Sequence, residues 1–349
     1  MPKLEKKQVA IYKYRHFRAE LLFLQSKRLN CMWIPCILLL IGLTLVVFGA
    51  DGLVDGASGI ARRFGLSEFV IGLTIVGMGT SAPEMVVSFI GAAQGNADIA
   101  VGNVIGSNIF NTLLILGLTA LLLPMGITPG NKKRDIPMNI GITVLLAVLG
   151  LKSTLFGLGQ DGLGRLEGGI LLLCFALYMW SCFRQKEQAP ADEGTVKERP
   201  VWQALLLVLG SIVALILGGR LFVNSAVQIA QALGWSDKFI AITILAGGTS
   251  MPELATCVAA AVKKKGQLAL GNIIGSNVFN ILLILGGSAL IHPLNFTDIS
   301  YIDLGVLLVS AVALFTSCYV GRKDKLDRLD GVFFLLIWAA YMAWLILHL

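Results

Sequence analysis

The sequence is poor in charge, because only 14% of its 349 residues are Asp, Glu, Lys or Arg, whereas 56% are hydrophobic and the mean hydropathy is +0.79. One soluble core of this size could not hide so much apolar surface, so the composition indicates a membrane protein. A period-two alternation of apolar and polar residues is also absent, which argues against a membrane barrel. Continuous apolar runs favour a helical bundle instead.

The sequence also lacks the residue clusters of common metal and hydrolytic sites. It has no HExxH motif, and no His or Lys is placed to activate a serine within an apolar stretch, which argues against an intramembrane hydrolase. The histidines are far apart, so a histidine metal site is not expected, and the cysteines show no close ligand spacing, so we predict small apolar core residues. They are His16, His292 and His348, and Cys31, Cys36, Cys174, Cys182, Cys257 and Cys318.

Ten apolar stretches have the length of membrane-spanning helices, which is about 17 to 25 residues. The sequence therefore predicts an all-α membrane protein with ten transmembrane helices. They lie near 35–51, 66–91, 98–123, 136–152, 165–183, 202–222, 237–262, 267–292, 301–320 and 331–348.

Two motifs occur twice, and the same sequence interval separates the two copies of each motif. The match extends without a gap from residues 65–124 to residues 234–293, which indicates an internal duplication. The ten predicted spans divide into two sets of five, one for each copy. Because five is odd, the second set must enter the membrane in the opposite direction to the first, as in the inverted-topology repeats of secondary transporters. We expect repeats at 32–183 and 201–349, joined by a linker at 184–200. The motifs are Gly79-Thr80-Ser81-Ala82-Pro83-Glu84 with Gly248-Thr249-Ser250-Met251-Pro252-Glu253, and Gly106-Ser107-Asn108-Ile109-Phe110-Asn111 with Gly275-Ser276-Asn277-Val278-Phe279-Asn280.

The distribution of basic residues predicts the orientation. One alternating set of loops, which includes the linker, holds 16 Lys and Arg, and the opposite set holds only Lys152, Arg165, Arg220 and Lys238. The positive-inside rule then places the linker in the cytoplasm. Residues 1–30 carry eight Lys and Arg yet would lie outside, so we interpret 1–31 as a non-native extension before Met32; a basic interfacial helix is the alternative.

Each copy of the first motif combines a helix-breaking proline with a carboxylate inside an apolar stretch. Pro83 cannot donate to the carbonyl of Gly79, and the glycines beside it favour local unwinding; Pro252 repeats this in the second copy. An ionisable residue inside a span costs about 2.5 to 3.5 kcal/mol and usually marks an ion pathway, although a kinked helix with a protonated glutamate is the simpler alternative. The freed carbonyls would form an all-oxygen cage suited to Ca²⁺ together with Thr80, Ser81, Glu84, Thr249, Ser250 and Glu253.

The second motif supplies a polar stripe, because residues four apart share one face of a helix. The glycine pairs beside each stripe, four residues apart, would allow a neighbouring helix to approach closely, although a polar packing seam is the alternative. We treat Asn103 and Asn272 as packing residues and include Ser107, Asn111, Ser276 and Asn280 in the candidate site.

At these motifs the chain resembles the cation/calcium exchanger superfamily, in particular the prokaryote-like members of the sodium/calcium exchanger group. The resemblance implies that Glu84 and Glu253 are the central Ca²⁺ and Na⁺ ligands and that Asn111 and Asn280 lie at the centre of the site. It also implies that the spans around Gly49 and Gly218 are sliding gate helices. Threonine oxygens would add to the site and serine hydroxyls would complete the Na⁺ sites, from Thr80, Thr249, Ser81, Ser250, Ser107 and Ser276.

The expected function is Na⁺/Ca²⁺ antiport in a cell membrane, the inner membrane if the source is bacterial, with inorganic cations as cargo and no cofactor, enzymatic activity or nucleic-acid partner. Asn at position 280, where K⁺-dependent members carry Asp, argues against K⁺ transport, and the linker is too short for the regulatory domains of animal relatives. A Ca²⁺/H⁺ antiporter that uses the same glutamates is the nearest alternative, and a channel is a third. The sequence does not determine the oligomeric state.

Overall fold

The computed structural model describes residues 33–157, 159–184, 200–234, 247–296, 301–320 and 324–348. The expected extension at 1–31, nearly all of the expected linker at 184–200 and the beginning of the expected seventh span lie outside these residues.

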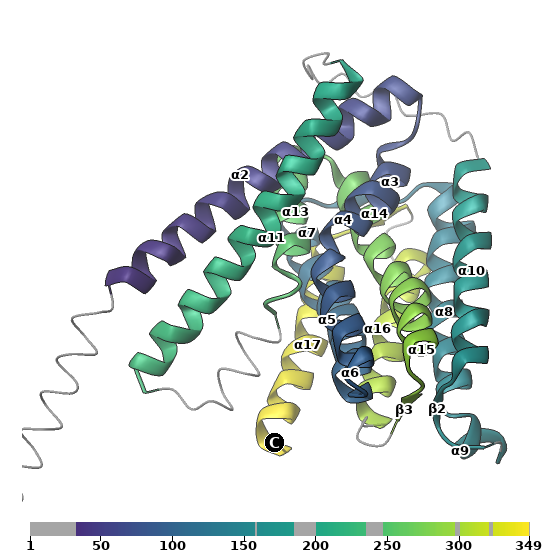
Figure 1. Cartoon of the computed structure of the whole chain (residues 1–349). Coiled ribbons are helices and arrows are strands. Elements are labelled where there is room, and N and C mark those ends of the chain that lie inside the picture. Colours follow the sequence, from purple (N-terminus) through teal and green to yellow (C-terminus); the bar gives the residue numbers. More distant parts are fainter. Residues whose placement is uncertain are drawn as a thin grey trace, which may run out of the picture.

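The first half of the chain folds into helices interrupted by short π-helical segments (Figure 1). The three π-helical segments described in this half are η1, η2 and η3, and the two strands have two residues each. In order, the elements are α2 (Trp33–Phe64), α3 (Glu68–Ile71), η1 (Gly72–Val76), α4 (Gly77–Thr80), α5 (Ala82–Ala93), α6 (Ala97–Ile109), η2 (Phe110–Ile115), α7 (Leu116–Leu122), β1 (Met125–Gly126), η3 (Asn131–Asp135), α8 (Ile136–Gly150), α9 (Lys152–Phe156), β2 (Gly162–Leu163) and α10 (Arg165–Arg184).

The described part of the second half repeats much of this order. Its elements are α11 (Val201–Ala232), α13 (Met251–Val262), α14 (Gly266–Val278), η5 (Phe279–Leu285), α15 (Gly286–Ile291), β3 (Leu294–Asn295), α16 (Tyr301–Tyr319), β4 (Lys325–Leu326) and α17 (Arg328–His348). The starts of α5 and α13, of α6 and α14, and of η2 and η5 are each separated by the same sequence interval as the two copies of the motifs.

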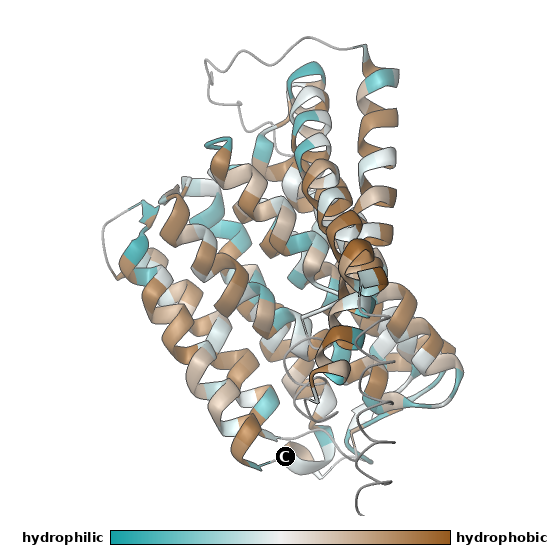
Figure 2. Cartoon of the chain, turned by 90° about the vertical axis from the view of Figure 1, so that its left-hand side faces the viewer, coloured by the Kyte–Doolittle hydropathy of each residue, from teal (hydrophilic) through white to brown (hydrophobic). Residues whose placement is uncertain are grey.

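The structure is helical and strongly apolar, as expected from the composition. Figure 2 shows hydrophobic residues along most of the length of the helices. Within the described residues, seven helices are long and apolar enough to cross a membrane, and the bent pair Glu68–Thr80 and Ala82–Ala93 makes an eighth. The expected fourth span coincides with α8, which has only 15 residues, and the expected seventh is described only from residue 247. The count of ten spans therefore stays a prediction.

Helices α2 and α11 lie side by side on one flank of the bundle and run in opposite directions (Figure 1). Their contact depends on small residues spaced seven apart in each helix. A Cβ added to Gly42 would lie 2.8 Å from the carbonyl oxygen of Gly218, and one added to Gly49 would lie 3.0 Å from that of Ser211. Seven residues further, a Cβ added to Gly56 would lie 3.1 Å from the carbonyl oxygen of Ala204. Glycine permits this close backbone approach because it has no side chain.

The span that carries the first Thr-Ser-X-Pro-Glu motif is bent by 49°. The bend is confined to Ser81 (φ −80°, ψ 6°), and α4 stays helical up to Thr80, so the expected unwinding around Gly79 is shorter than predicted. Ser250 has nearly the same backbone conformation before α13 (φ −86°, ψ 10°). Pro83 and Pro252 each lie at the second position of the helix that follows, where a missing N–H is tolerated, so one residue absorbs the break.

The two parts of this bent span have different neighbours. Helix α5 packs on α6 of its own half and on η5 and α15 of the second half, whereas α3, η1 and α4 pack on α14 of the second half. The expected close approach is found for one of the two glycine pairs, since Gly271 and Gly275 lie against the carbonyl oxygens of Phe69 and Leu73, which a Cβ would approach to 2.3 and 2.2 Å. For the other pair, Gly102 and Gly106, nothing among the described residues lies within 4 Å of an added Cβ, and the second-half counterpart of α3 and η1 lies outside those residues. The run Gly266–Ile291 is the centre of the bundle, because 94% of its apolar window is buried.

Two short antiparallel strand pairs also connect the halves. Strand β1 pairs with β4, and β2 pairs with β3. The first pair joins two turns that the basic residues predict to be cytoplasmic, and Lys132 and Asp324 add an ion pair of 2.7 Å there. The second pair joins two turns that are predicted to lie on the opposite side.

Candidate functional site

The glutamates of the repeated motif lie inside the bundle. Glu84 is in the first turn of α5 and Glu253 in the first turn of α13, and both side chains are fully buried. Their carboxyl groups are close enough to interact electrostatically. The structure therefore brings together two acidic groups from opposite halves of the chain and directs neither of them toward lipid.

Each glutamate accepts hydrogen bonds from the bent segment of the opposite half. The Ser81 hydroxyl donates to Glu253 Oε1 at 2.9 Å, and the Ser250 hydroxyl donates to Glu84 Oε1 at 3.1 Å. The neighbouring threonines follow the same crossed pattern, since Thr80 interacts with the Glu253 carboxyl and Thr249 with that of Glu84. Neither half alone can assemble this arrangement.

The serines of the second motif contribute unequally. Ser276 on α14 donates to Glu253 Oε1 at 3.2 Å and reaches the carbonyl oxygen of Gly77 at 3.5 Å. Ser107, its counterpart on α6, is also buried, but within the described residues it makes no hydrogen bond to a glutamate. The structure thus joins one of the two predicted serines of this motif to a carboxylate.

Four buried oxygens at this place have no hydrogen-bond donor within the described part of the chain. They belong to the two glutamates and to the two asparagines that end the second motif, and they are Glu84 Oε2, Glu253 Oε2, Asn111 Oδ1 and Asn280 Oδ1. Buried acceptors without a donor are costly, and a cation satisfies them by coordination. Carboxylate, amide and hydroxyl oxygens form the ligand set that hard cations such as Ca²⁺ prefer.

Asn111 and Asn280 lie in π-helical segments that face the glutamates of the other half. Segment η2 carries Asn111 and packs against α13, whereas η5 carries Asn280 and packs against α5. π-helical turns shift the side-chain register of a helix and are frequent at functional sites.

Asn108 and Asn277 contact these asparagines directly and were missing from the predicted site. Asn280 Nδ2 donates to Asn108 Oδ1 at 2.9 Å, and Asn111 Nδ2 donates to Asn277 Oδ1 at 3.4 Å. The sequence did carry the signal, because Asn108 and Asn277 hold the same place in both copies of the second motif. A stripe of residues four apart excluded them, whereas a spacing of three would have included them.

Asn103 and Asn272, which the sequence assigned to packing, support the backbone and hydroxyls of the site. Asn103 Nδ2 donates to the carbonyl oxygen of Glu84 at 3.1 Å and to Ser88 Oγ at 3.0 Å. Asn272 Oδ1 accepts from the Thr80 hydroxyl at 3.1 Å, and its Nδ2 approaches Cys257 Sγ at 3.3 Å.

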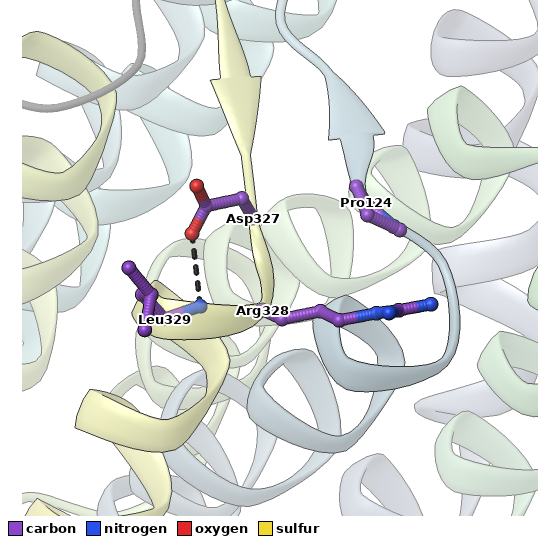
Figure 3. Close-up of a pocket in the computed structure, with 4 residues that line it drawn as sticks. All are labelled: Pro124, Asp327, Arg328 and Leu329. Atoms are coloured by element: carbon purple, nitrogen blue, oxygen red, sulfur yellow. Dashed lines mark hydrogen bonds between the residues drawn. The ribbon is translucent and has the colours of Figure 1, made fainter.

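Other polar features of the described residues lie outside this constellation. No group of three or more His, Cys, Asp or Glu side chains in the described ranges could hold a metal ion. A separate hollow of about 450 Å³ lies where α17 begins. It is lined by Pro124, Asp327, Arg328 and Leu329 (Figure 3). Its one hydrogen bond between lining residues runs from the Leu329 N–H to Asp327 Oδ1 at 2.9 Å, and none of these residues belongs to the predicted site.

The expectation of core cysteines is confirmed in part. Cys182, Cys257 and Cys318 are buried and Cys174 is half-buried, but Cys36 is exposed on α2. The prediction was wrong for Cys36 because the outer face of a helix in a membrane protein also carries small apolar residues. Cys31 lies outside the described residues.

Comparison with known proteins identifies the family. The family model described as "Sodium/calcium exchanger protein" matches residues 34–184 and 203–347. A putative antiporter, CaxA, from Alkalimonas amylolytica is 39% identical over 321 residues, which are 89% of this chain and 98% of that protein. The sodium/calcium exchanger MaX1 from Methanosarcina acetivorans is 32% identical over 340 residues, with 88% and 97% covered.

Solved structures agree with these sequence relatives. A structure of the sodium-calcium exchanger NCX_Mj, soaked with 10 mM Na⁺ and zero Ca²⁺, superimposes with a TM-score of 0.77 at 32% identity, and it covers 89% of this chain and 99% of that one. The chain therefore belongs to the sodium/calcium exchanger family of multi-pass membrane proteins, and it is a cation/Ca²⁺ antiporter, not an enzyme.

Proposed function

We propose that this chain exchanges Na⁺ for Ca²⁺ by alternating access at one site between its halves, with Glu84 and Glu253 as the central ligands. The observation that carries the proposal is the crossed contact of each buried glutamate with a serine of the opposite half. A site shared in this way changes whenever the halves move relative to each other, as alternating access requires. The remaining proposed ligands are Thr80, Thr249, Asn111, Asn280, Ser81, Ser250, Ser107 and Ser276.

Charge explains why the movement would be an obligatory exchange. Two ionised carboxylates in an apolar bundle repel each other and are costly to carry past an apolar gate. One Ca²⁺ or several Na⁺ would neutralise them. The carrier is then expected to change sides when loaded with either cation and seldom when empty.

The proposed architecture is two inverted five-helix repeats, at 32–183 and 201–349, joined by a cytoplasmic linker at 184–200. The antiparallel contact of α2 with α11 supports this arrangement, since these helices begin the two halves. The strand pairs support the orientation, because each pair joins two turns that are predicted to lie on the same side.

Flux through proteoliposomes tests the exchange. Radiolabelled Ca²⁺ should enter vesicles when an outward Na⁺ gradient is imposed and should stop entering with Glu84→Gln or Glu253→Gln. Glu167→Gln is the matched control, because Glu167 lies on α10 and pairs with Lys152 away from the site. Uptake that is indifferent to Na⁺, or that survives both site variants, would reject the proposal.

Labelling tests the orientation. A membrane-impermeant maleimide applied to intact cells should react with Gln160→Cys and not with Lys133→Cys, and permeabilised cells should label both. Gln160 is exposed just before β2 and Lys133 is exposed on η3, so access to the reagent depends on the side of the membrane. The reverse pattern would invert the proposed topology.

A Ca²⁺/H⁺ antiporter with the same two glutamates is the second candidate. The number of hydroxyl and amide oxygens near the carboxylates favours Na⁺, because a proton needs one acceptor whereas Na⁺ needs several ligands. A pH jump in the absence of Na⁺ separates the two. Ca²⁺ movement driven by the pH jump alone would establish the second candidate.

A further inference from the structure

Four buried asparagines, two from each half, form one hydrogen-bonded group beside the glutamates. They are Asn108 and Asn277, which lie one residue before the ends of α6 and α14, and Asn111 and Asn280, which lie in the π-helical segments that follow. Their bonds cross between the halves, from Asn280 to Asn108 at 2.9 Å and from Asn111 to Asn277 at 3.4 Å.

An asparagine amide has a donor end and an acceptor end, and its partners decide which end points where. The NH₂ groups of Asn111 and Asn280 are both directed at an asparagine oxygen of the other half. Their own oxygens are consequently turned away from that contact, and both are buried without a donor within the described residues. A cation requires this orientation, because an amide NH₂ would repel it.

Asn108 and Asn277 are themselves held in place. Asn108 Nδ2 donates to the backbone oxygen of Asn277 at 3.2 Å, and Asn277 Nδ2 donates to the Thr112 hydroxyl at 2.8 Å. Because their donor ends are occupied, their oxygens are left to accept from Asn280 and Asn111.

We propose that Asn108 and Asn277 are positioning residues that turn the amide oxygens of Asn280 and Asn111 toward the transported cation. This inference rests on the proposed function, since it requires Asn111 and Asn280 to be cation ligands. Asn108 acts through Asn280, and Asn277 acts through Asn111. Each orienting contact crosses between the halves, so the binding geometry depends on how the halves meet.

Asn108→Leu removes the acceptor at similar side-chain volume and leaves the Asn280 amide free to turn over. Loss of a group that orients a metal ligand typically weakens binding by about 10-fold to 100-fold. We therefore expect equilibrium binding of radiolabelled Ca²⁺ to the purified full-length protein to weaken by about that factor. Asn277→Leu should act similarly through Asn111.

A double-mutant cycle distinguishes orientation from simple packing. Asn280→Asp places a carboxylate at this position, and a carboxylate presents an oxygen whichever way it turns. The loss of Ca²⁺ binding caused by Asn108→Leu should fall below about twofold when Asn280→Asp is also present, and it should persist with Asn111→Asp. The loss of Ca²⁺ binding caused by Asn277→Leu should be suppressed only by Asn111→Asp. Equal penalties in both backgrounds would overturn the inference.

Thr112→Val is a milder variant that keeps the asparagines intact if the leucine variants fail to fold. It removes the acceptor that holds Asn277, so it should weaken Ca²⁺ binding, and Asn111→Asp should suppress that loss. No change in binding with Thr112→Val, or a loss that Asn111→Asp does not suppress, would contradict the inference. If Glu84→Gln and Glu253→Gln leave Ca²⁺ binding unchanged, the proposed function fails as well; if they abolish it while the cycles are additive, only the positioning role fails.

Discussion

Ser81 and Glu253 are 172 residues apart in the chain, yet the Ser81 hydroxyl donates a hydrogen bond of 2.9 Å to the Glu253 carboxylate. Ser250 and Glu84 form the matching contact at 3.1 Å. Each half thus completes the polar environment of the other half's acid. A local change at Ser81 or Ser250 therefore alters the hydrogen bonding of the carboxylate in the opposite half.

Removal of the Ser81 hydroxyl should weaken the binding of Na⁺ more than the binding of Ca²⁺. Na⁺ depends on several neutral oxygens, whereas Ca²⁺ gains most from the two carboxylates. We expect Ser81→Ala to raise the half-saturating Na⁺ concentration by about fivefold to tenfold, equivalent to roughly 1 to 1.4 kcal/mol, with a smaller change for Ca²⁺. The measurement is Na⁺-driven uptake of radiolabelled Ca²⁺ at graded Na⁺.

Ser310→Ala is the matched control, because Ser310 is also buried but donates to the carbonyl oxygen of Leu307 within its own helix at 2.7 Å. Ser310→Ala should leave the half-saturating concentrations of Na⁺ and of Ca²⁺ unchanged. A larger change for Ca²⁺ than for Na⁺ with Ser81→Ala would contradict the assigned role.

Gly275→Ala should destabilise the contact between α14 and the first-half bent span. The added Cβ would lie 2.2 Å from the backbone oxygen of Leu73, so the helices must separate. Overpacking of this kind typically costs about 1 to 3 kcal/mol. Thermal unfolding of the detergent-purified protein should therefore begin at a lower temperature.

Gly210→Ala controls for the loss of glycine itself. Nothing lies within 4 Å of a Cβ at Gly210 within α11. The midpoint temperature of unfolding of Gly210→Ala should therefore stay unchanged or rise slightly, because Ala favours helix. An equal midpoint for both variants would show that α14 does not need the close approach at Gly275.

These close approaches show how far the sequence could predict the fold. The bend at Ser81 followed from Pro83, and the tight contact at Gly275 followed from small residues four apart. Which helix fills that contact did not follow. The partner of Gly275 is Leu73 of the other half, and only the assembled bundle decides such a pairing.

The candidate site was also predictable only in part. A charge inside an apolar stretch is rare, so Glu84 and Glu253 stood out from the sequence alone. Amides are less conspicuous, since Asn also packs membrane helices through hydrogen bonds without binding an ion. The roles of Asn108 and Asn277 depend on π-helical turns that begin just after them, at Phe110 and Phe279.

The turn before β2 should loosen at low pH. Asp161 accepts hydrogen bonds from the Thr154 hydroxyl and N–H and from the Ser153 N–H, and these bonds lower the pKa of its carboxyl. A lowered folded pKa means that the contact contributes fully above the unfolded pKa of about 3.9 and is lost as pH falls through the folded value. Amide hydrogen exchange at Ser153 and Thr154, corrected for the intrinsic rate, should accelerate in that range.

Asp161→Ala should give the same fast exchange at neutral pH, with little further change on acidification. Exchange in this variant that still depends on pH as in the unaltered protein would assign the effect to another group.

Helices α2 and α11 should move as one unit. A Cβ at Gly52 would lie 3.8 Å from the Cβ of Ser211, which is the usual separation in a disulfide. Gly52→Cys with Ser211→Cys, in a background without native cysteines, should therefore crosslink on oxidation and keep exchanging Ca²⁺. Gly52→Cys with Gly210→Cys is the unlinked control. Flux that stops on oxidation and returns on reduction would show that the two helices slide past each other.

Lys263 connects the end of α13 to α2 through two ion pairs, to Asp51 at 2.6 Å and to Asp55 at 2.7 Å. The residues at the same sequence interval as the repeated motifs from these three are Gln94, Arg220 and Asn224, which cannot form such pairs. This contact therefore holds α2 directly and α11 only through its packing on α2.

Loss of the Lys263 ion pairs should release α2 and favour its movement relative to α13. Half-exposed ion pairs contribute about 0.2 to 1 kcal/mol each, so loss of both pairs in Lys263→Gln should raise the maximal exchange rate by about twofold to 30-fold where this movement limits turnover. Lys264→Gln is the control, since Lys264 lies next to Lys263 and its substitution leaves both ion pairs in place. High salt should raise the rate of the unaltered protein toward that of Lys263→Gln, because ions screen exposed pairs. A rate that Lys263→Gln lowers or leaves unchanged would mean that α2 is not restrained by this contact during transport.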